Sequence, residues 1–308
     1  MISKARGFAA ALLIIIVLFS GGCSAAIPPK IDLQKTVTAA QLQNMVKTKT
    51  NYYYVGFDWR LEPSEDVKMY LPLLNYLEHK TGYRFRLRVF PQDVDIAREM
   101  GTGQIQFSIM GPLSILQAEK YGVKSLVIGV TENGTSSYRS MIVTQPQSPI
   151  HNIQDLRGKS LAFGPRNSTQ GYLIPRIILA KANLKLSDLA SFESFQSYAD
   201  AANAVLSGRF DAAALQDTLA EKLAAQGLVK IIAVSDYFPS GGIAAAPGIK
   251  PNVISAVQKA LLQFAPEGKD KAGLYHWENS EMPKGFAEIK GDPYAVFRFW
   301  AKTLGLLN

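Results

Sequence analysis

The stretch LAFGPRNSTQGYLIPR at residues 161–176 decides the fold, because a strand, a polar turn and a helix follow one another in it. The apolar run Leu161–Phe163 predicts a buried strand. The turn residues Asn167–Thr169 are types that favour the N-cap of a helix, so a helix is expected over about 170–182. A strand that passes through a polar turn into a helix is the repeating unit of an α/β protein.

The start of this expected helix is a candidate anion site. The first N–H groups of a helix lack internal acceptors, and the helix dipole adds about half a positive charge there. The hydroxyls of Ser168 and Thr169 add hydrogen-bond donors, and Asn167 and Gln170 belong to the same turn. Gly171 has no Cβ, so a ligand can approach the backbone. The pattern predicts binding of phosphate, phosphonate, sulfate or carboxylate. The competing interpretation is that Ser168 only caps its own helix.

A second strand–turn–helix unit is expected at residues 105–117, IQFSIMGPLSILQ. Gly111-Pro112 follows a short apolar strand, and proline suits the first turn of a helix. We expect Ser114 and the neighbouring backbone amides to face the same cleft as the 167–171 turn, from the opposite side. A plain joint between a strand and a helix is the alternative.

Three aromatic residues and one acid are further candidates for contact with a ligand: Trp59, Tyr138, Tyr198 and Asp217. The hydroxyl of Tyr198 is able to hydrogen-bond an oxyanion. Asp217 follows a predicted strand and is placed to accept from a ligand amine or hydroxyl. Packing between the lobes is the alternative for Trp59, and a solvated helix start is the alternative for Asp217.

Strands and helices alternate along the chain from about residue 52. YYYVGF at 52–57 is rich in aromatic and β-branched residues, which favour a strand. MYLPLLNYLEHK at 69–80 places its apolar residues at helical spacing. The alternation predicts mixed sheets flanked by helices.

Two segments are interpreted as crossings between lobes, QPQSPI at 145–150 and DYFPSGG at 236–242. Lobe 1 is then expected to contain 52–144 plus 237–308, and lobe 2 to contain 145–236. Two short crossings act as a hinge that closes the lobes around a ligand.

The first residues predict export. A basic start precedes the apolar run Phe8–Phe19, and the small residues Ser20-Gly21-Gly22 lead to Cys23. This order is typical of a secretory signal, expected here at 1–22 and followed by a tether at 23–51. As a helix the apolar run rises about 18 Å, which is short for a hydrocarbon core of about 30 Å.

Cys23 is the only cysteine of the chain, and the segment before it resembles a bacterial lipoprotein signal. The resemblance implies that Cys23 is lipidated and becomes the first residue, so that acyl chains hold the protein on a membrane face. An ordinary signal peptide with an incidental cysteine is the alternative.

The composition argues against several other classes of protein. The formal net charge of +8 suits an anionic ligand, but no basic stripe is interleaved with aromatic residues, so no nucleic acid partner is expected. The three histidines are scattered, and neither HExxH nor GxSxG occurs. We therefore expect no enzyme, cofactor or metal site, and a monomer that binds a small anion.

Several motifs occur together in the order found in a known family. They are MGPLS at 110–114, SPIHNIQDLRGKSLAFG at 148–164, NSTQGYLIP at 167–175, AVLSGRFDAAAL at 204–215 and DPYAVF at 292–297. Over about 52–307 the chain resembles the periplasmic phosphate/phosphite/phosphonate-binding proteins of ABC transporters, a branch of the type II periplasmic binding proteins.

The resemblance implies a two-lobed α/β fold and an envelope receptor that hands a phosphorus oxyanion to an ABC permease. An adaptor that presents a bound solute to an envelope sensor kinase is the alternative. The chain departs from the family pattern at Met110, where a tyrosine is usual, and at Tyr198, where a histidine is usual. These departures imply that the wall which reads the substituent on phosphorus is altered.

Overall fold

The computed structural model describes residues 52–60, 63–91 and 94–307. The chain divides into two units, Met1–Lys49 and Thr50–Asn308, and the described residues all belong to the second. The predicted signal segment, Cys23 and the tether lie outside the described residues.

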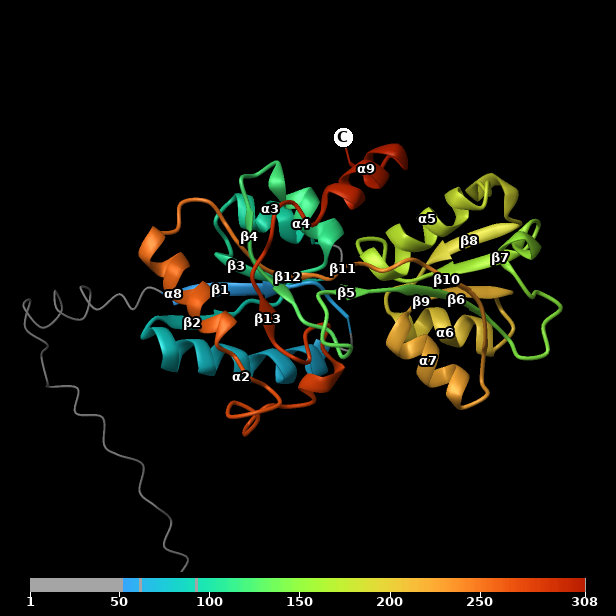
Figure 1. Ribbon diagram of the computed structural model, residues 1–308. Coiled ribbons are helices and arrows are strands. Elements are labelled where there is room, and N and C mark those ends of the chain that lie inside the picture. The colour runs from blue at the N-terminus through green and yellow to red at the C-terminus, as the bar shows by residue number, and fades with distance from the viewer. Residues whose placement is uncertain (1–51, 61–62, 92–93, 308) are drawn as a thin grey trace, which may run out of the picture. The chain divides into compact units, whose positions relative to one another are not determined.

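A six-stranded mixed sheet organises one half of this unit (Figure 1). β1 runs parallel to β2 and β3, whereas β12 runs antiparallel to β3 and β4. In spatial order the strands are β13 (Phe286–Ala287), β4 (Lys124–Gly129), β12 (Gly242–Ala245), β3 (Phe107–Met110), β1 (Tyr52–Phe57) and β2 (Arg84–Leu87). One face packs on α2 (Pro63–Thr81) and α8 (Pro251–Leu262), and the other on α3 (Ile96–Gly101), α4 (Pro112–Glu119) and α9 (Ala295–Thr303).

A five-stranded mixed sheet organises the other half. β7 is parallel to β8 and β9, whereas β6 is antiparallel to β9 and β10. In spatial order the strands are β10 (Lys230–Val234), β6 (Ser140–Thr144), β9 (Ala212–Gln216), β7 (Ser160–Phe163) and β8 (Ser191–Ser194). α6 (Tyr198–Leu206) and α7 (Asp217–Ala225) cover one face, and α5 (Ile174–Lys181) covers the other. Short helical turns lie at Ile153–Leu156, Thr169–Leu173, Leu186–Asp188 and Trp277–Asn279.

The chain passes between the two halves at two adjacent places. β5 (Ser137–Tyr138) pairs antiparallel with β11 (Phe238–Pro239), and each lies at a point where the chain changes sheets. β6, which the sequence interpretation placed before the first crossing, lies in the five-stranded sheet, so the chain changes sheets between β5 and β6. All five residues of β6 are buried, as expected of a strand covered on both faces. The exact division into lobes stays a prediction.

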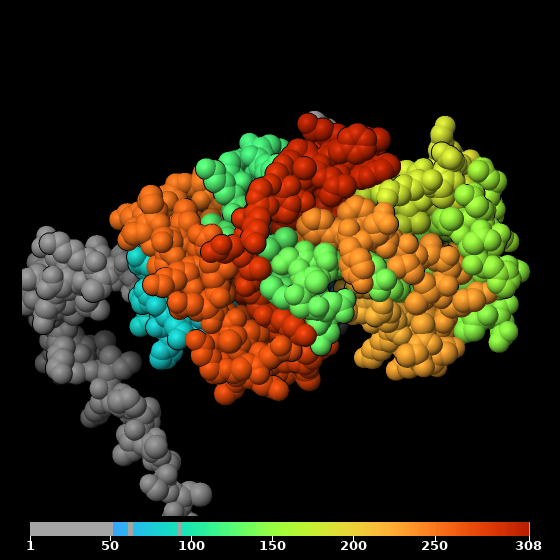
Figure 2. All heavy atoms as spheres, viewed as in Figure 1, coloured from blue at the N-terminus to red at the C-terminus, as the bar shows by residue number. Residues whose placement is uncertain are grey.

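Apolar contacts continue from one half to the other. One core cluster contains Leu113 of α4 together with Leu173 and Ile177 on the helix of the five-stranded half. Leu306, after α9, packs against this cluster and against the core of the five-stranded half. Figure 2 shows the C-terminal segment lying against both halves. Among the described residues, no helix combines the length and the hydropathy that a bilayer crossing requires.

Candidate functional site

The predicted polar turn begins a helix, as expected from its cap residues. Thr169–Leu173 form a π-helical turn that continues directly into α5. Ser168 is the N-cap, and its Oγ accepts a hydrogen bond from the Gly171 amide at 2.9 Å. The hydroxyl of Ser168 therefore caps its own helix, which was the competing interpretation of this serine.

Tyr198 packs closely against this turn. Its hydroxyl lies 2.5 Å from the Ser168 Oγ, and the residue is 5% exposed. A Cβ on Gly171 would lie 2.8 Å from the Tyr198 ring and 2.9 Å from the Cα of Gly164. Glycine at 171 is required for this close packing of helix, ring and strand end.

The two segments singled out in the sequence meet between the halves. The Leu113 amide in the first turn of α4 donates to the Thr169 Oγ1 at 2.9 Å, although the residues lie 56 positions apart. α4 begins at Gly111-Pro112 without a side-chain cap of its own, so its first amides take acceptors from elsewhere. Ser114 is 3% exposed in the same turn.

Asp58, directly after β1, supplies the second acceptor at this helix start. Its Oδ2 accepts from the Gly111 amide at 2.9 Å. Burial raises the pKa of the Asp58 carboxyl, and the Gly111 amide, the Ser114 hydroxyl and the charge of Arg60 oppose that rise in part. Sequence reasoning missed Asp58; the available signal was an acid that ends an apolar strand, YYYVGF.

Gln170 and Asp217 tie the turn to the first crossing. The Gln170 Nε2 donates to the Arg139 carbonyl at 2.8 Å and to the Asp217 Oδ1 at 3.2 Å. The Asp217 Oδ2 accepts from the Arg139 amide at 2.9 Å, and the Ser140 hydroxyl donates to the Gln170 carbonyl at 2.7 Å. Both side chains therefore hold the helix start against the backbone that links the two halves.

Tyr138 lies beneath the contact between the halves and is 3% exposed. Burial raises its pKa well above the usual range, and the nearby Thr169 hydroxyl opposes that rise. The pKa of Tyr198 is likewise raised, mainly by burial. Both phenols therefore stay protonated near neutral pH, where a phenol O–H can donate to an anion.

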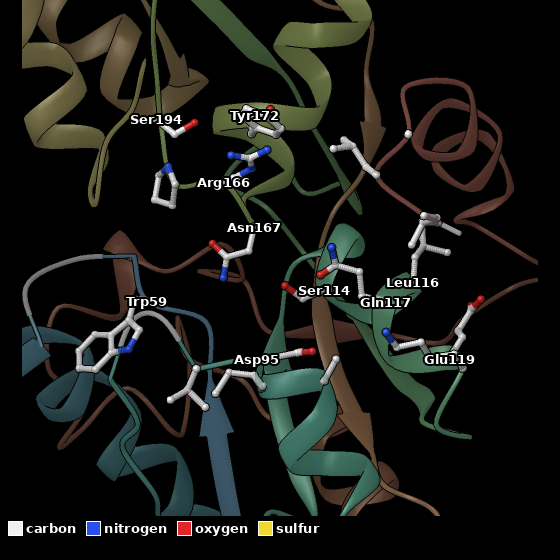
Figure 3. A pocket seen from close by; sticks show the side chains of 18 of the residues that line it. Trp59, Asp95, Ser114, Leu116, Gln117, Glu119, Arg166, Asn167, Tyr172 and Ser194 are labelled. Atoms are coloured by element: carbon white, nitrogen blue, oxygen red, sulfur yellow. The ribbon is translucent and has the colours of Figure 1, made fainter. Parts of the chain in front are cut away.

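A cleft of about 1140 Å³ opens between the halves. Of the sequence-predicted residues, Trp59, Ser114 and Asn167 line it, and Figure 3 shows them around a common hollow with Asp95 and Arg166. The remaining candidates lie outside its lining: Ser168, Thr169, Gln170, Gly171, Tyr138, Tyr198 and Asp217.

The candidate residues that line the cleft differ in whether their hydrogen-bonding groups are available to a ligand. The indole N–H of Trp59 donates to the Phe90 carbonyl at 2.9 Å, and its ring packs edge-on against Phe57 at 5.3 Å. Trp59 thus offers a ring face and no free donor. Asn167 is half-buried, and its side chain makes no hydrogen bond to any described residue. Within residues 52–60, 63–91 and 94–307, no cluster of three potential metal-ligating His, Cys, Asp or Glu side chains occurs.

Two α/β halves joined by paired crossings, with helix starts meeting beside a cleft, define the class of solute-binding proteins that close around a ligand. The sequence model of one family, described as "ABC transporter, phosphonate, periplasmic substrate-binding protein", matches residues 56–294. The chain belongs to this family of periplasmic binding proteins, which are not enzymes.

Known relatives and solved structures agree with this assignment. The phosphonates-binding periplasmic protein of Escherichia coli is 29% identical over 134 residues, 41% of this chain and 40% of that protein. A probable ABC transporter phosphite binding protein of Prochlorococcus marinus is 27% identical over 168 residues, 52% of this chain and 50% of that protein. The chain thus spans half or less of the length of these curated relatives.

The fold is shared with solved structures at lower identity. A binding protein component of an ABC phosphonate transporter from Pseudomonas aeruginosa superposes with a TM-score of 0.71 at 18% identity, covering 84% of this chain and 89% of that one. PhnD1 from Prochlorococcus marinus in complex with methylphosphonate gives 0.70 at 16% identity, covering 82% and 98%. These structures confirm the predicted fold class.

Proposed function

We propose that this protein is an envelope receptor that captures a small phosphorus oxyanion between its two halves and delivers it to an ABC importer. The observation that carries the proposal is the contact of the Leu113 amide with Thr169, because it sets the helix start of α4 directly against the predicted anion-binding turn. The positive end of a helix is suited to phosphorus oxyanions. The names of the relatives support the same ligand class.

Ser114 and Asn167 are the proposed ligand contacts on the two sides of the cleft. Both line it, and they belong to different halves, so a ligand that contacts both favours the closed arrangement. Trp59 then forms a wall of the cleft. The remaining candidates shape and support the turn: Ser168, Thr169, Gln170, Gly171, Tyr138, Tyr198 and Asp217. The crossings at β5–β6 and β10–β11 serve as the hinge.

The test is calorimetric titration with methylphosphonate, phosphite, phosphate and sulfate, for the wild type and for Ser114→Ala and Asn167→Ala. Each lost hydrogen bond to a charged ligand is expected to weaken binding by roughly tenfold or more. Ser108→Ala and Asn252→Ala are matched controls, because Ser108 is a buried serine of β3 and Asn252 an exposed asparagine of α8, both outside the cleft lining. Unchanged affinity in both cleft variants would exclude this site.

The lipid anchor at Cys23 is proposed from the sequence. Cys23→Ala is expected to release the protein from the membrane fraction into the soluble fraction of the cell envelope, because each acyl chain contributes about 0.8 kcal/mol per buried CH₂. Fractionation followed by immunoblotting measures this, with the wild type as reference. Retention of the variant on the membrane would contradict the anchor.

A further inference from the structure

Positive charge is concentrated along β2, an edge strand of the six-stranded sheet. The segment KTGYRFRLRVFP at residues 80–91 contains four basic side chains and no acid. Its three arginines occupy alternate positions, and the residues between them, Phe85 and Leu87, pack into the core over α2 and α8. Because successive side chains of a strand point to opposite faces, the arginines share the other face, along the border of the sheet.

Aromatic rings lie beneath two of these arginines. The guanidinium carbon of Arg86 is 3.6 Å from the ring centre of Tyr52 in β1, and that of Arg88 is 5.5 Å from the ring centre of Tyr54. Val89, the next residue along the chain, is 47% exposed. The group is called the β2 patch and consists of Tyr52, Arg84, Arg86, Arg88 and Val89.

The protein compensates little of the charge of the β2 patch. Arg86 is exposed and forms no ion pair with any described residue. Arg88 donates to the backbone carbonyl and to the side-chain oxygen of Gln104, both at 2.9 Å, and these acceptors are neutral. Arg84 pairs with Glu78 at 3.2 Å, and its side chain is still 63% exposed. A patch of this kind attracts an anionic surface.

The β2 patch lies where the described chain begins and outside the cleft. Tyr52 is the first described residue, and Arg84 lies directly opposite it in the parallel ladder of β1 and β2. None of the five residues of the patch lines the cleft. Figure 1 shows that β1 and β2 begin at the end of the six-stranded half that points away from the five-stranded half. A surface that meets the patch therefore leaves the cleft accessible to a ligand.

The predicted lipid anchor favours a bilayer as the partner of this patch. Cys23 precedes Tyr52 by 29 positions. A chain of that length spans at most about 100 Å when fully extended, so an acylated Cys23 keeps the patch near a bilayer at a high effective concentration. Arginine is attracted to anionic lipids, and tyrosine is favoured at the boundary between lipid and water. The point where the chain enters the fold, the charge and the aromatic ring thus fit the same partner.

We propose that the β2 patch docks the six-stranded half on an anionic membrane surface and so orients the anchored receptor with its cleft accessible. The inference goes beyond the proposed function, because it concerns a surface outside the ligand site and holds for any solute. Each arginine near an anionic bilayer strengthens adsorption about fivefold. The attraction falls with ionic strength, because salt screens exposed charges.

The test is co-sedimentation of the full-length Cys23→Ala chain, which carries no acyl group, with two kinds of vesicle. One is phosphatidylcholine alone, and the other is phosphatidylcholine mixed with phosphatidylglycerol. We expect the chain to prefer the anionic vesicles, and Arg84→Gln combined with Arg86→Gln to lower its affinity for them about tenfold or more. The preference should weaken as salt rises from about 0.05 M to about 0.5 M. All variants share the residues before Tyr52, so differences between them report on the described surface.

The matched control is Arg157→Gln combined with Arg209→Gln in the five-stranded half. Arg157 pairs with Asp188 at 3.1 Å and is 58% exposed, and the guanidinium carbon of Arg209 is 4.7 Å from the ring centre of Phe195. One arginine beside an acid and one over a ring repeat the surroundings found in the β2 patch, and the loss of charge is the same. Affinity for anionic vesicles should stay within about twofold, because charges far from the bilayer are screened.

A second measurement locates the contact directly. The Cys23→Ala chain has no cysteine, so Val89→Cys or Leu228→Cys provides a single position for an environment-sensitive fluorophore. Leu228 is 43% exposed, close to the 47% of Val89, and lies in the five-stranded half. Only the label at position 89 is expected to shift its emission to shorter wavelength on anionic vesicles, because it alone enters the lipid interface.

Each outcome supports or overturns the docking surface. Equal losses of affinity in the two double variants would mean that only net charge attracts the vesicles, and would overturn it. No preference for anionic vesicles, or equal shifts of both labels, would overturn it too, and the arginines would then serve only to protect the edge strand from pairing with other chains. Ligand titration of the Arg84→Gln and Arg86→Gln variant should match the wild type, so failure of one proposal leaves the other intact.

Discussion

The two helix starts that meet between the halves are built in opposite ways. α4 begins at Gly111-Pro112 with no side-chain cap, and its amides take acceptors from Asp58 and from Thr169 of the other half. The helix that begins at Thr169 is capped internally by Ser168. The first amides of α4, which has no side-chain cap, thus depend on acceptors from other segments, including the other half. The helix that begins at Thr169 has its acceptor in Ser168 whether or not the halves are in contact.

The largest expected effect is on the self-capped helix start. Gly171→Ala places a methyl group 2.8 Å from the Tyr198 ring and 2.9 Å from the backbone of Gly164, where the strand end cannot give way. Overpacking of this kind costs about 1–3 kcal/mol in the free energy of unfolding, which urea denaturation monitored by circular dichroism measures.

Gly268→Ala serves as the control for this substitution, because its new Cβ would meet its nearest neighbours at an ordinary 3.8 Å. That variant should stay within about 0.5 kcal/mol of the wild type. If the two alanine variants are equally stable, the close packing around Gly171 contributes little to the free energy of unfolding.

The next effect distinguishes the two helix starts from each other. Thr169→Val keeps the shape of the side chain but leaves the Leu113 amide of α4 without its acceptor, at a cost of about 1–3 kcal/mol. Ser168→Ala removes a cap within one helix, at a cost of about 1 kcal/mol.

The two variants should differ in where hydrogen exchange speeds up. Thr169→Val is expected to deprotect the first turn of α4 in the other half, while Ser168→Ala deprotects its own turn and the start of α6, where the Tyr198 hydroxyl loses its partner, within the same half. Identical exchange maps would mean that the contact between the halves does not persist in solution.

The smallest expected effect concerns the pH dependence of stability. Because burial raises the pKa of Asp58, the charged carboxylate disfavours the folded state of the ligand-free protein, and stability falls as pH rises from the unfolded value through the raised one. Asp58→Asn should therefore be more heat-stable than the wild type at neutral pH. Thermal unfolding from pH 4 to 8 should show the advantage disappearing toward the acidic end, whereas a constant difference would contradict a raised pKa.

Features that depend on neighbouring residues, such as helix starts, could be predicted from the sequence. Contacts between residues far apart in the chain could not. The cap residues at 167–169 and the Gly-Pro pair at 111–112 are short-range signals, and both helices start where these signals place them. The proline-rich turn after β6 resembles a linker in the sequence, whereas the pairing of β6 with β9 and β10 depends on distant strands and has no local signal.

The hydrogen-bond partners within the site could also not be predicted from the neighbouring sequence. Asp58 lies 53 positions from Gly111, and Thr169 lies 56 positions from Leu113. No periodicity or cap preference connects residues at such separations. An acid at the end of a strand and a threonine in a turn are both common in sequences. Only the fold shows that they accept hydrogen bonds from the start of the same helix, α4.

The pairing of β5 with β11 has a mechanical consequence. Tyr138 lies opposite Phe238 in this short ladder, so the two connections between the halves are bonded to each other. Sliding of one half past the other would break this ladder. We therefore expect any relative motion of the two halves to be a rotation about the paired connections, in which both bend together.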